Sequence, residues 1–441
     1  MTDLLDSTAD RTVFERIEGE LSTDRSGNGH GTAVTLWSPR ECVDPTMDPQ
    51  RRRLLKVLGA AGLGGLAGCT GGPSESTPTE EPTDTPTATP SGGDGGSDGG
   101  DGGMDDTPTA TATATATPMD PTNIGMVYAT GGLGDGSFND QAQQGLFQAE
   151  EDFSIEYQQS QPETTSEFST FQRQFAESDD PDYDLVCCIG FLQTDALSTS
   201  SENYPDQHFM LVDSVVQADN VANYTFKEHE GSYLVGQLAG LLTTQEFSAG
   251  TGSTSGDSTN VGFVGGVEGD LIRKFEAGFT AGVKAGDSDV DVITNYVGGF
   301  SDPAGGKEAA LAMYNSGADI VYHAAGNTGT GVFQAAQEQG KFAIGVDRDQ
   351  SVTKESFQDV ILASMVKRVD TAVYNAIKAE VNGNFPGGSI TSLGLSEEGV
   401  GIVYGQQLGS EIPENVKTQI SDSRQGIIDG DISVPTDPGN A

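Results

Sequence analysis

Basic residues are scarce in this sequence. Its 441 residues include 22 Lys and Arg against 66 Asp and Glu, which gives a formal net charge of -44 at pH 7. Such a charge repels phosphate, so nucleic acid is excluded as a partner. A large acidic excess also keeps a protein soluble in concentrated salt. We therefore expect a protein of a high-salt archaeon, in which acidic residues need not mark a site.

Cysteine is also rare, and its usual partners in metal sites are few. The chain has four histidines and four cysteines, namely Cys42, Cys69, Cys187 and Cys188. No CxxC pair or Cys/His ligand spacing occurs, so neither a zinc site nor a disulfide framework is expected. The acidic run at residues 94–106 lacks the DxDxDG spacing of a calcium loop. The sequence therefore predicts no metal and no cofactor.

Signatures of common catalytic sites are missing from the sequence. There is no GxSxG elbow, HExxH helix or GxxxxGK[ST] loop. His323 lies at the end of an apolar run, where a ligand could reach it, but a structural histidine is the favoured interpretation. Gly326, Gly329 and Gly331 could cradle a phosphate at a helix N-terminus, yet no lysine follows in the P-loop position. A binding site without chemistry fits these observations better than an enzyme.

A short apolar run near the N-terminus has the features of an export signal. Residues 51–53 are arginines, residues 54–68 are apolar or small except for Lys56, and Cys69 follows directly. The run is shorter than the about 20 residues of a membrane span. The arginines resemble a twin-arginine signal, and residues 66–69 resemble a lipobox, in which the cysteine becomes the lipid-modified first residue. An uncleaved amphipathic anchor is the alternative.

These features predict how the first part of the chain is processed. Residues 1–46 would be an extension upstream of the true start at Met47, and residues 47–68 the twin-arginine lipoprotein signal peptide. Cys69 would anchor the mature chain to the extracellular face of the cell membrane. Residues 69–121, rich in Thr, Pro, Gly and Asp, have too little apolar surface to offset their ordering entropy. We expect them to form an extended tether.

The remainder of the chain repeats one pattern, a short apolar run that ends at Gly, Asp or Asn. It first occurs at residues 123–140, NIGMVYATGGLGDGSFND, and a helical pattern follows at residues 141–153. The apolar runs return at residues 184–191, 208–214, 260–266, 293–302, 318–329 and 342–349. Repeated strand, loop and helix units predict α/β lobes with doubly wound parallel sheets. Ligands of such sheets bind beyond the carboxyl ends of the strands.

The number of repeats suggests two lobes. We predict lobe 1 at residues 122–226 and lobe 2 at residues 227–346. The chain should cross back near Asp347, so that residues 347–438 supply the other crossings and complete both lobes. Residues 439–441 would be a tail. Three crossings would make a three-segment hinge beside a cleft.

Several motifs resemble those of the basic membrane protein (BMP) family, in the family's order. They are DGSFN at 135–139, GFVGG at 262–266, FEAGFTAGVK at 275–284, AGNTG at 325–329, IGVDRDQ at 344–350 and SMVK at 364–367. The resemblance implies a type I periplasmic-binding-protein fold. It also implies a lipid-anchored receptor that binds a purine nucleoside and delivers it to the permease subunits of an ABC importer, without enzymatic activity. We expect a monomer.

The resemblance implies roles for individual residues as well. Asp135 and Asn139 match positions at the cleft, and Asp213 matches an acid that meets the nucleobase. Asp347 and Lys367 match a pair that holds the ribose hydroxyls. Carboxylates accept hydrogen bonds from such hydroxyls and an ammonium donates to their oxygens, at about 1.5–3 kcal/mol each.

The chain departs from the resemblance at one position that matters for stacking on the base. Several relatives carry an aromatic residue just before the glycine that matches Gly145, whereas this chain has Gln143 and Gln144. Stacking must then come from aromatic residues at strand ends. The candidates are Phe138, Phe191, Phe300 and Tyr322, and Gly326 and Asn327 in a neighbouring loop complete the predicted ligand site.

Some of these residues also have a purely structural interpretation. Asp135 could cap its helix, Phe138 could belong to the core, and Asp347 and Lys367 could form an ion pair at the hinge. Two other function classes remain open. A sensory receptor would use the same fold for another small polar solute, and a nucleoside-hydrolysing enzyme would reveal itself by turnover.

Overall fold

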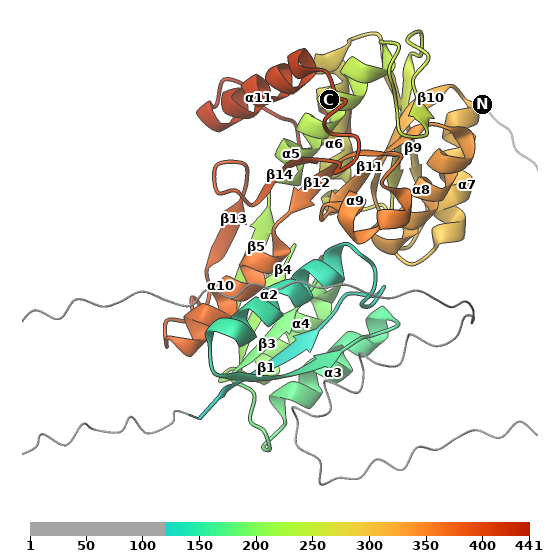
Figure 1. Ribbon diagram of the computed structural model, residues 1–441. Coiled ribbons are helices and arrows are strands. Elements are labelled where there is room, and N and C mark those ends of the chain that lie inside the picture. The colour runs from blue at the N-terminus through green and yellow to red at the C-terminus, as the bar shows by residue number, and fades with distance from the viewer. Residues whose placement is uncertain (1–119) are drawn as a thin grey trace, which may run out of the picture. The chain divides into compact units, whose positions relative to one another are not determined.

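The computed structural model describes residues 120–441, which form two α/β lobes, each with a six-stranded sheet (Figure 1). In the sheet of lobe 1 the strand order is β13-β5-β4-β3-β1-β2, and all neighbours are parallel. The strands are β1 (Thr122–Val127), β2 (Ile155–Ser160), β3 (Leu185–Cys188), β4 (His208–Val212), β5 (Val221–Phe226) and β13 (Ile390–Leu393). The helices are α2 (Phe138–Asp152), η1 (Thr165–Glu167), α3 (Phe168–Ala176), η2 (Phe191–Gln193), α4 (Thr194–Asn203) and α10 (Val369–Val381).

The sheet of lobe 2 has the order β14-β12-β11-β10-β8-β9. Its strands are β8 (Asn260–Gly265), β9 (Asp291–Tyr296), β10 (Ala318–Ala324), β11 (Phe342–Asp347), β12 (Ile361–Lys367) and β14 (Val400–Tyr404). Around them are α5 (Glu228–Thr243), α6 (Asp270–Gly286), α7 (Pro303–Asn315), η3 (Gly326–Thr328), α8 (Gly329–Gln339), α9 (Gln350–Thr353), η4 (Glu355–Phe357) and α11 (Glu414–Asp429), and η5 (Pro438–Asn440) ends the chain. The predicted fold class, two lobes with parallel sheets, is confirmed, with β14 as an antiparallel edge strand.

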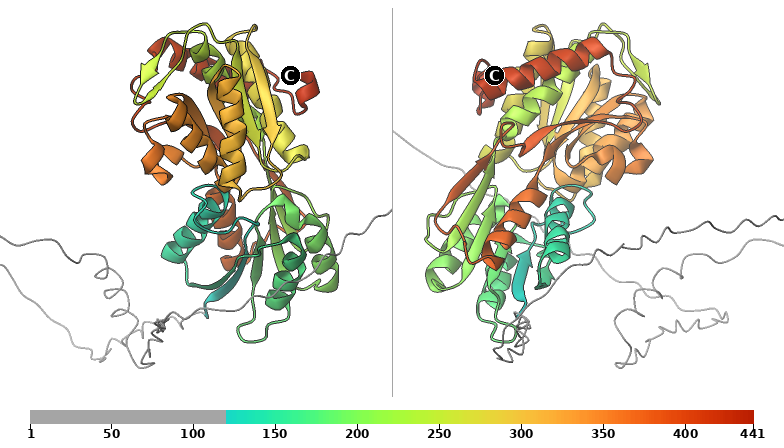
Figure 2. Two further views of the ribbon diagram at one scale, coloured as in Figure 1. Left: turned by 90° about the vertical axis from the view of Figure 1, so that its right-hand side faces the viewer. Right: turned by 60° about the vertical axis from the view of Figure 1, so that its left-hand side comes forward.

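The chain passes between the two sheets three times, after β5, after β12 and after β13. The second passage lies at Arg368 and not near Asp347, as expected from the sequence. The reason is that β12 pairs in parallel with β11 and so keeps residues 361–367 in lobe 2. The views of Figure 2 show α10, which follows this passage, beside α2 of lobe 1. Because β14 enters lobe 2 from the crossing side, Lys367 at the end of β12 lies opposite Val400 at the start of β14.

Two helices of lobe 2, α5 and α6, pack backbone against backbone. A Cβ atom at Gly236 of α5 would collide with the carbonyl oxygen of Phe279, and one at Gly282 of α6 with that of Tyr233. Glycine at these positions therefore permits the close approach, in spite of its cost in a helix interior. The contact joins the first turns of α5 to the middle of α6, because a Cβ atom at Gly278 of α6 would likewise collide with the carbonyl oxygen of His229.

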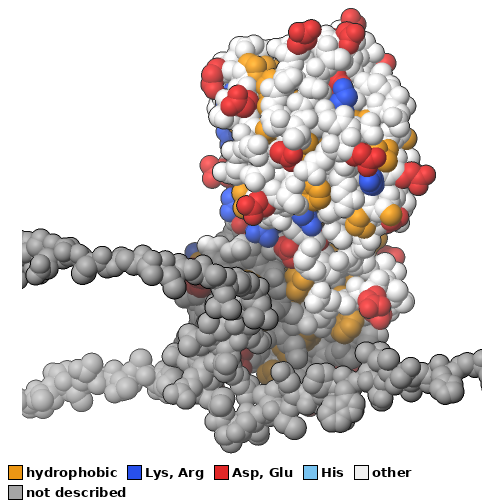
Figure 3. Space-filling model, turned by 45° about the vertical axis from the view of Figure 1, so that its right-hand side comes forward, with side chains coloured by type: hydrophobic (Ala, Val, Ile, Leu, Met, Phe, Trp, Pro, Cys, Tyr) orange, Lys and Arg blue, Asp and Glu red, His pale blue; other side chains and the backbone are white. Residues whose placement is uncertain are grey.

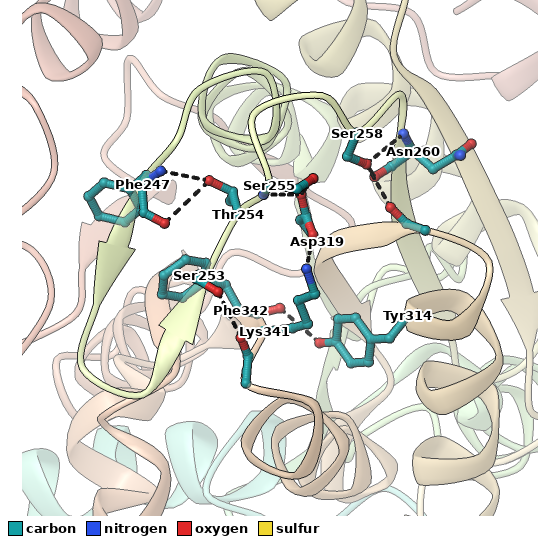
Figure 4. Close-up of polar contacts among 12 residues, drawn as sticks. Phe247, Ser253, Thr254, Ser255, Ser258, Asn260, Tyr314, Asp319, Lys341 and Phe342 are labelled. Carbon is teal, nitrogen blue, oxygen red and sulfur yellow. Dashed lines mark hydrogen bonds and ion pairs between the residues drawn. The ribbon is translucent and has the colours of Figure 1, made fainter.

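The edge of lobe 2 that lies away from the crossings is tied together by a separate polar network. The Asp319 carboxylate, near the start of β10, accepts hydrogen bonds from the backbone N–H and the hydroxyl of Ser255, at 3.0 and 3.1 Å. It also pairs with the Lys341 ammonium, as Figure 4 shows. Asp319 is almost fully buried. The network holds the segment that includes the two-stranded sheet of β6 (Ser248–Ala249) and β7 (Gly252–Ser253).

Acidic side chains are dispersed over the surface, and Figure 3 shows them with fewer basic ones on the visible face of the described residues. No helix within residues 120–441 combines the length and apolar character that crossing a membrane requires. Cys187 and Cys188 are free and buried in β3. The predictions for the extension, the signal peptide, Cys69 and all but the last two residues of the tether lie outside the described residues.

Candidate functional site

A cavity lies at the carboxyl ends of the central strands of both sheets, where the sequence pattern places the ligand site. Its walls enclose about 630 Å³ of empty space, part of it open to solvent. Nine of the eleven predicted ligand residues line it: Asp135, Phe138, Asn139, Phe191, Asp213, Phe300, Gly326, Asp347 and Lys367.

Two carboxylates of the cavity are held by an unusual backbone. Asp213 directly follows β4 in lobe 1, and Asp347 is the last residue of β11 in lobe 2. Their φ angles are 72° and 65°, in the left-handed region that residues other than glycine seldom adopt. Strain of this kind is concentrated at functional sites, where the surrounding structure maintains it. Both side chains are thereby directed into the cavity from opposite lobes.

The Lys367 side chain is the cationic centre of the cavity and is 1% exposed. Its Nζ atom lies 2.6 Å from Asp213 Oδ2 and 3.2 Å from Glu228 Oε1. Burial alone would lower the pKa of Lys367, but the Asp213 and Glu228 carboxylates raise it above its ordinary value. Lys367 is therefore charged, and its bond to Asp213 joins the two lobes.

Three phenyl rings surround the same ammonium. The centroids of Phe226, Phe138 and Phe275 lie 5.1, 5.2 and 5.5 Å from Lys367 Nζ. Rings at this distance attract a cation through their π faces. Phe138 and Phe275 also line the cavity and belong to different lobes. Phe138 is half-buried and packs against the core. It therefore contributes both to the core, as the structural interpretation proposed, and to the wall of the cavity.

Asp347 does not pair directly with Lys367, as the hinge interpretation would require. No Nζ to carboxylate contact within 4.0 Å joins the two among the residues described. The Asp347 carboxylate instead accepts a hydrogen bond of 2.5 Å from the Ser137 hydroxyl of lobe 1. Burial raises the pKa of Asp347 to about 7, although the charge of Lys367 opposes the shift. This carboxyl is thus poised to change its charge near neutral pH.

Asp135 both lines the cavity and caps a helix. Its carboxylate accepts hydrogen bonds from the backbone N–H groups of Ser137, Asn139 and Asp140, at 2.8, 2.9 and 3.2 Å. These groups belong to the start of α2, so the capping interpretation describes its contacts. Burial raises the pKa of Asp135, and the backbone N–H groups oppose the shift. The neighbouring Asn139 holds the loop after β1 by accepting from the N–H of Ala129 at 2.9 Å.

Aromatic rings form much of the apolar wall. Phe191 of lobe 1 meets Phe300 of lobe 2 edge to face, with centroids 6.4 Å apart. The sequence reasoning missed Phe275 because it considered strand ends only. The amino ends of helices lie at the same edge of a doubly wound sheet, and Phe275 follows the first turn of α6. Its position near a helix start was the signal that could have found it.

The structure corrects two predicted positions, Tyr322 and Asn327, neither of which lines the cavity. Tyr322 is fully buried, and its ring lies 5.0 Å from Phe279 and 5.6 Å from Phe263. It is wrong as a stacking candidate because β10 continues two residues further and this side chain points into the core. Asn327 is half-buried, and its amide oxygen accepts from the Thr330 hydroxyl at 3.0 Å.

His323 has a structural role, as the favoured interpretation proposed. It is fully buried, and its Nε2 atom lies 2.9 Å from Gln350 Oε1. Burial lowers the pKa of His323 to about 3, so the ring is neutral. Gly329 and Gly331 serve packing, because a Cβ atom at Gly329 would collide with the His323 ring and one at Gly331 with the Pro303 carbonyl oxygen. In residues 120–441, no His, Cys, Asp and Glu side chains are grouped as metal ligands.

Comparison with known proteins places the chain in a family. Residues 122–437 match the family described as ABC transporter substrate-binding protein PnrA-like (Bmp). A CD4+ T-cell-stimulating antigen of Listeria monocytogenes is 37% identical over 334 residues, which cover 71% of this chain and 88% of that protein. The ABC transporter nucleoside-binding protein BmpA of Lactococcus lactis is 34% identical over 331 residues, or 70% and 88% of the two chains.

A solved structure of a related protein supports the same assignment. The solute-binding protein of an ABC transporter system from Aeropyrum pernix is 29% identical, with a TM-score of 0.64 over 72% of this chain and 94% of that chain. The family match includes both lobes and every residue of the cavity. The chain therefore belongs to the Bmp family of ABC transporter substrate-binding proteins.

Proposed function

We propose that the protein binds a purine nucleoside in the cavity between its lobes and delivers it to an ABC permease. The observation that carries the proposal is the pair of rings from opposite lobes, Phe138 and Phe275, beside the charged cluster of Asp213, Asp347 and Lys367. A nucleoside has a flat aromatic base and a sugar with several hydroxyl groups. The base matches the aromatic wall of the cavity, and the sugar matches the charged cluster.

The base stacks between the rings, and the ribose reaches the charged end. Asp347 accepts from a ribose hydroxyl, and the Lys367 ammonium donates to a ribose oxygen. Asp213, whose Oδ2 atom accepts a hydrogen bond of 2.6 Å from Lys367 in this structure, accepts from an N–H group of the purine. Hydrogen bonds to charged partners contribute about 1.5–3 kcal/mol each. The ligand thus replaces contacts that the two lobes otherwise make with each other.

The charge of the site favours a nucleoside over a nucleotide. The carboxyl groups of Asp213, Glu228 and Asp347 act on the Lys367 ammonium, and the only other ammonium within 4.0 Å of these three carboxyls among the described residues is that of Lys274, 3.8 Å from Glu228. A phosphate would add negative charge to a buried region in which carboxylates already outnumber cations. Like charges that meet in such a region repel strongly. The preferred ligand therefore carries no phosphate.

Thermal unfolding in molar salt tests the proposed ligand class. A ligand that binds only the folded protein stabilises it by about 2.7 kcal/mol at a hundredfold excess over Kd. Adenosine, guanosine or inosine should therefore raise the melting temperature clearly, and the corresponding 5′-monophosphates should raise it much less. If no nucleoside, purine or pyrimidine, moves the transition, the assignment of the ligand is wrong.

Nucleoside binding should depend on pH through Asp347. With a pKa of about 7, this carboxyl is about one-tenth ionised at pH 6, so affinity there should be about tenfold lower than at pH 8. Calorimetric titration at both values measures the difference, and Asp347→Asn should abolish it. The pH dependence of folding stability has the opposite sign to that of binding. The Asp347 carboxyl holds its proton more tightly in the folded protein than in the unfolded chain, so it adds to the free energy of unfolding as pH falls from 7 towards 4. An equal affinity at pH 6 and pH 8 would exclude Asp347 from the contact.

We also propose that the mature protein starts at the lipid-modified Cys69 and is exported by the twin-arginine route. Its tether then leaves the lobes free on the extracellular face of the membrane. Replacing Arg51 and Arg52 with lysines should leave the precursor in the cytoplasm, and Cys69→Ser should leave it unprocessed or release it into the medium. Cell fractionation measures both effects. Full processing and membrane attachment in both variants would refute this location.

A further inference from the structure

Glu228 is a buried carboxylate that the proposed binding mode does not use. It is the first residue of α5, its side chain is fully buried, and it does not line the cavity. Within the described residues its oxygens accept no hydrogen bond from another side chain or from a neighbouring backbone, and its cationic neighbours are Lys367 at 3.2 Å and Lys274 at 3.8 Å. A charge buried with so few partners is unfavourable unless an ion pair offsets the lost hydration.

The two carboxylate partners of Lys367 come from different lobes. Lys367 ends β12 and Glu228 begins α5, and both elements belong to lobe 2. Asp213 follows β4 and belongs to lobe 1. The shorter contact, 2.6 Å to Asp213, therefore changes when the lobes move apart, whereas the contact with Glu228 stays within one lobe.

We propose that Glu228 is a positioning residue that keeps Lys367 charged and aimed at the cleft when Asp213 turns to a ligand or moves away with lobe 1. Only the identity of that ligand, a nucleoside, rests on the proposed function. Because Lys367 also pairs with Glu228, Asp213 can move away from Lys367 without leaving a buried, unpaired ammonium. Glu228 thereby makes Asp213 available for recognition.

The surrounding charges agree with this role. Burial alone would lower the pKa of Lys367. The carboxyl groups of Asp213, Glu228 and Asp347 raise it. For Glu228, in contrast, burial raises the pKa, and the ammonium groups of Lys367 and Lys274 oppose this shift. Once Asp213 is absent, Glu228 is the nearest group that maintains the charge of Lys367.

The charge of Lys367 can be followed without any ligand, by NMR titration of the full chain with ¹³C-labelled lysine. In Asp213→Asn, Lys367 should stay charged at pH 8. Adding Glu228→Gln should lower the Lys367 pKa by about 1–3 units. The single variant Glu228→Gln should lower the Lys367 pKa by less. If the double variant does not fold, the direction of this change in the single variant decides the question. An unchanged Lys367 pKa in these variants would overturn the proposal.

A second measurement, nucleoside affinity by calorimetry, separates this role from a general effect on α5. Glu228→Gln should weaken binding about tenfold. The control is Glu230→Gln, in the same helical turn, where Glu230 accepts from the N–H of Leu395 at 2.8 Å and pairs with Lys227 at 3.3 Å. This control should lower stability but leave affinity unchanged, and equal losses in both variants would contradict positioning. If the unchanged protein binds no nucleoside, the proposed function fails, while the Lys367 titration still decides the role of Glu228.

Discussion

Replacing Lys367 with alanine is expected to weaken nucleoside binding by two orders of magnitude or more. The substitution removes the proposed donor to the ribose, and Asp213 and Glu228 lose the ammonium that lies 2.6 and 3.2 Å from them. Losing one partner of a buried charged pair costs about 2–5 kcal/mol. A free purine base should also bind more weakly, because Lys367 holds Asp213 in place, but the loss should be smaller than for the nucleoside. Calorimetric titration with both ligands measures the two losses.

A matched substitution in the same lobe tests whether the effect is local. Lys341 pairs with the buried Asp319 at the edge of the sheet away from the cavity (Figure 4). Lys341→Met should therefore lower the melting temperature but leave nucleoside affinity unchanged. Normal affinity in Lys367→Ala together with lowered stability would show that Lys367 only supports the fold.

Removing the rings that we propose as the stacking surfaces for the base should have the next largest effect. Stacking on an aromatic side chain is worth about 1–3 kcal/mol per base. Phe275→Ala and Phe138→Ala should each lower nucleoside affinity about ten- to a hundredfold, and Phe275→Leu should recover only part of the loss. Phe333→Leu is the control, because this ring is fully buried and packs on His323, away from the cavity. If the control lowers affinity as much as Phe275→Ala, stacking is not the cause.

Most of the cavity could be predicted from where apolar runs end. The pattern of residues 123–140 placed Asp135, Phe138 and Asn139 after the first strand, and the cavity contains all three. Parallel strands bring such ends to one edge of a sheet, so residues far apart in sequence meet there. Asp213 and Asp347 also stand at the ends of apolar runs, and the resemblance to the BMP family implied their place in the ligand site without knowledge of their backbone angles.

Other features depend on contacts that local patterns do not encode. Tyr322 lies two residues before the end of β10, and only the true end of that strand shows that its ring enters the core. The bond between Lys367 and Asp213 joins residues 154 positions apart and requires the second crossing at Arg368. Glu228 begins a helix with an ordinary polar first turn, so the local sequence does not reveal that its side chain is buried beside Lys367.

The central claim is that a nucleoside lies between the two lobes. A crystal structure of the protein grown with guanosine or adenosine in molar salt tests it most directly. We predict density for the base between Phe138 and Phe275, the ribose within hydrogen-bond distance of Asp347 and Lys367, and the Lys367 ammonium still in contact with Glu228. A cavity without nucleoside at a saturating ligand concentration, or a nucleoside bound elsewhere, would contradict the account.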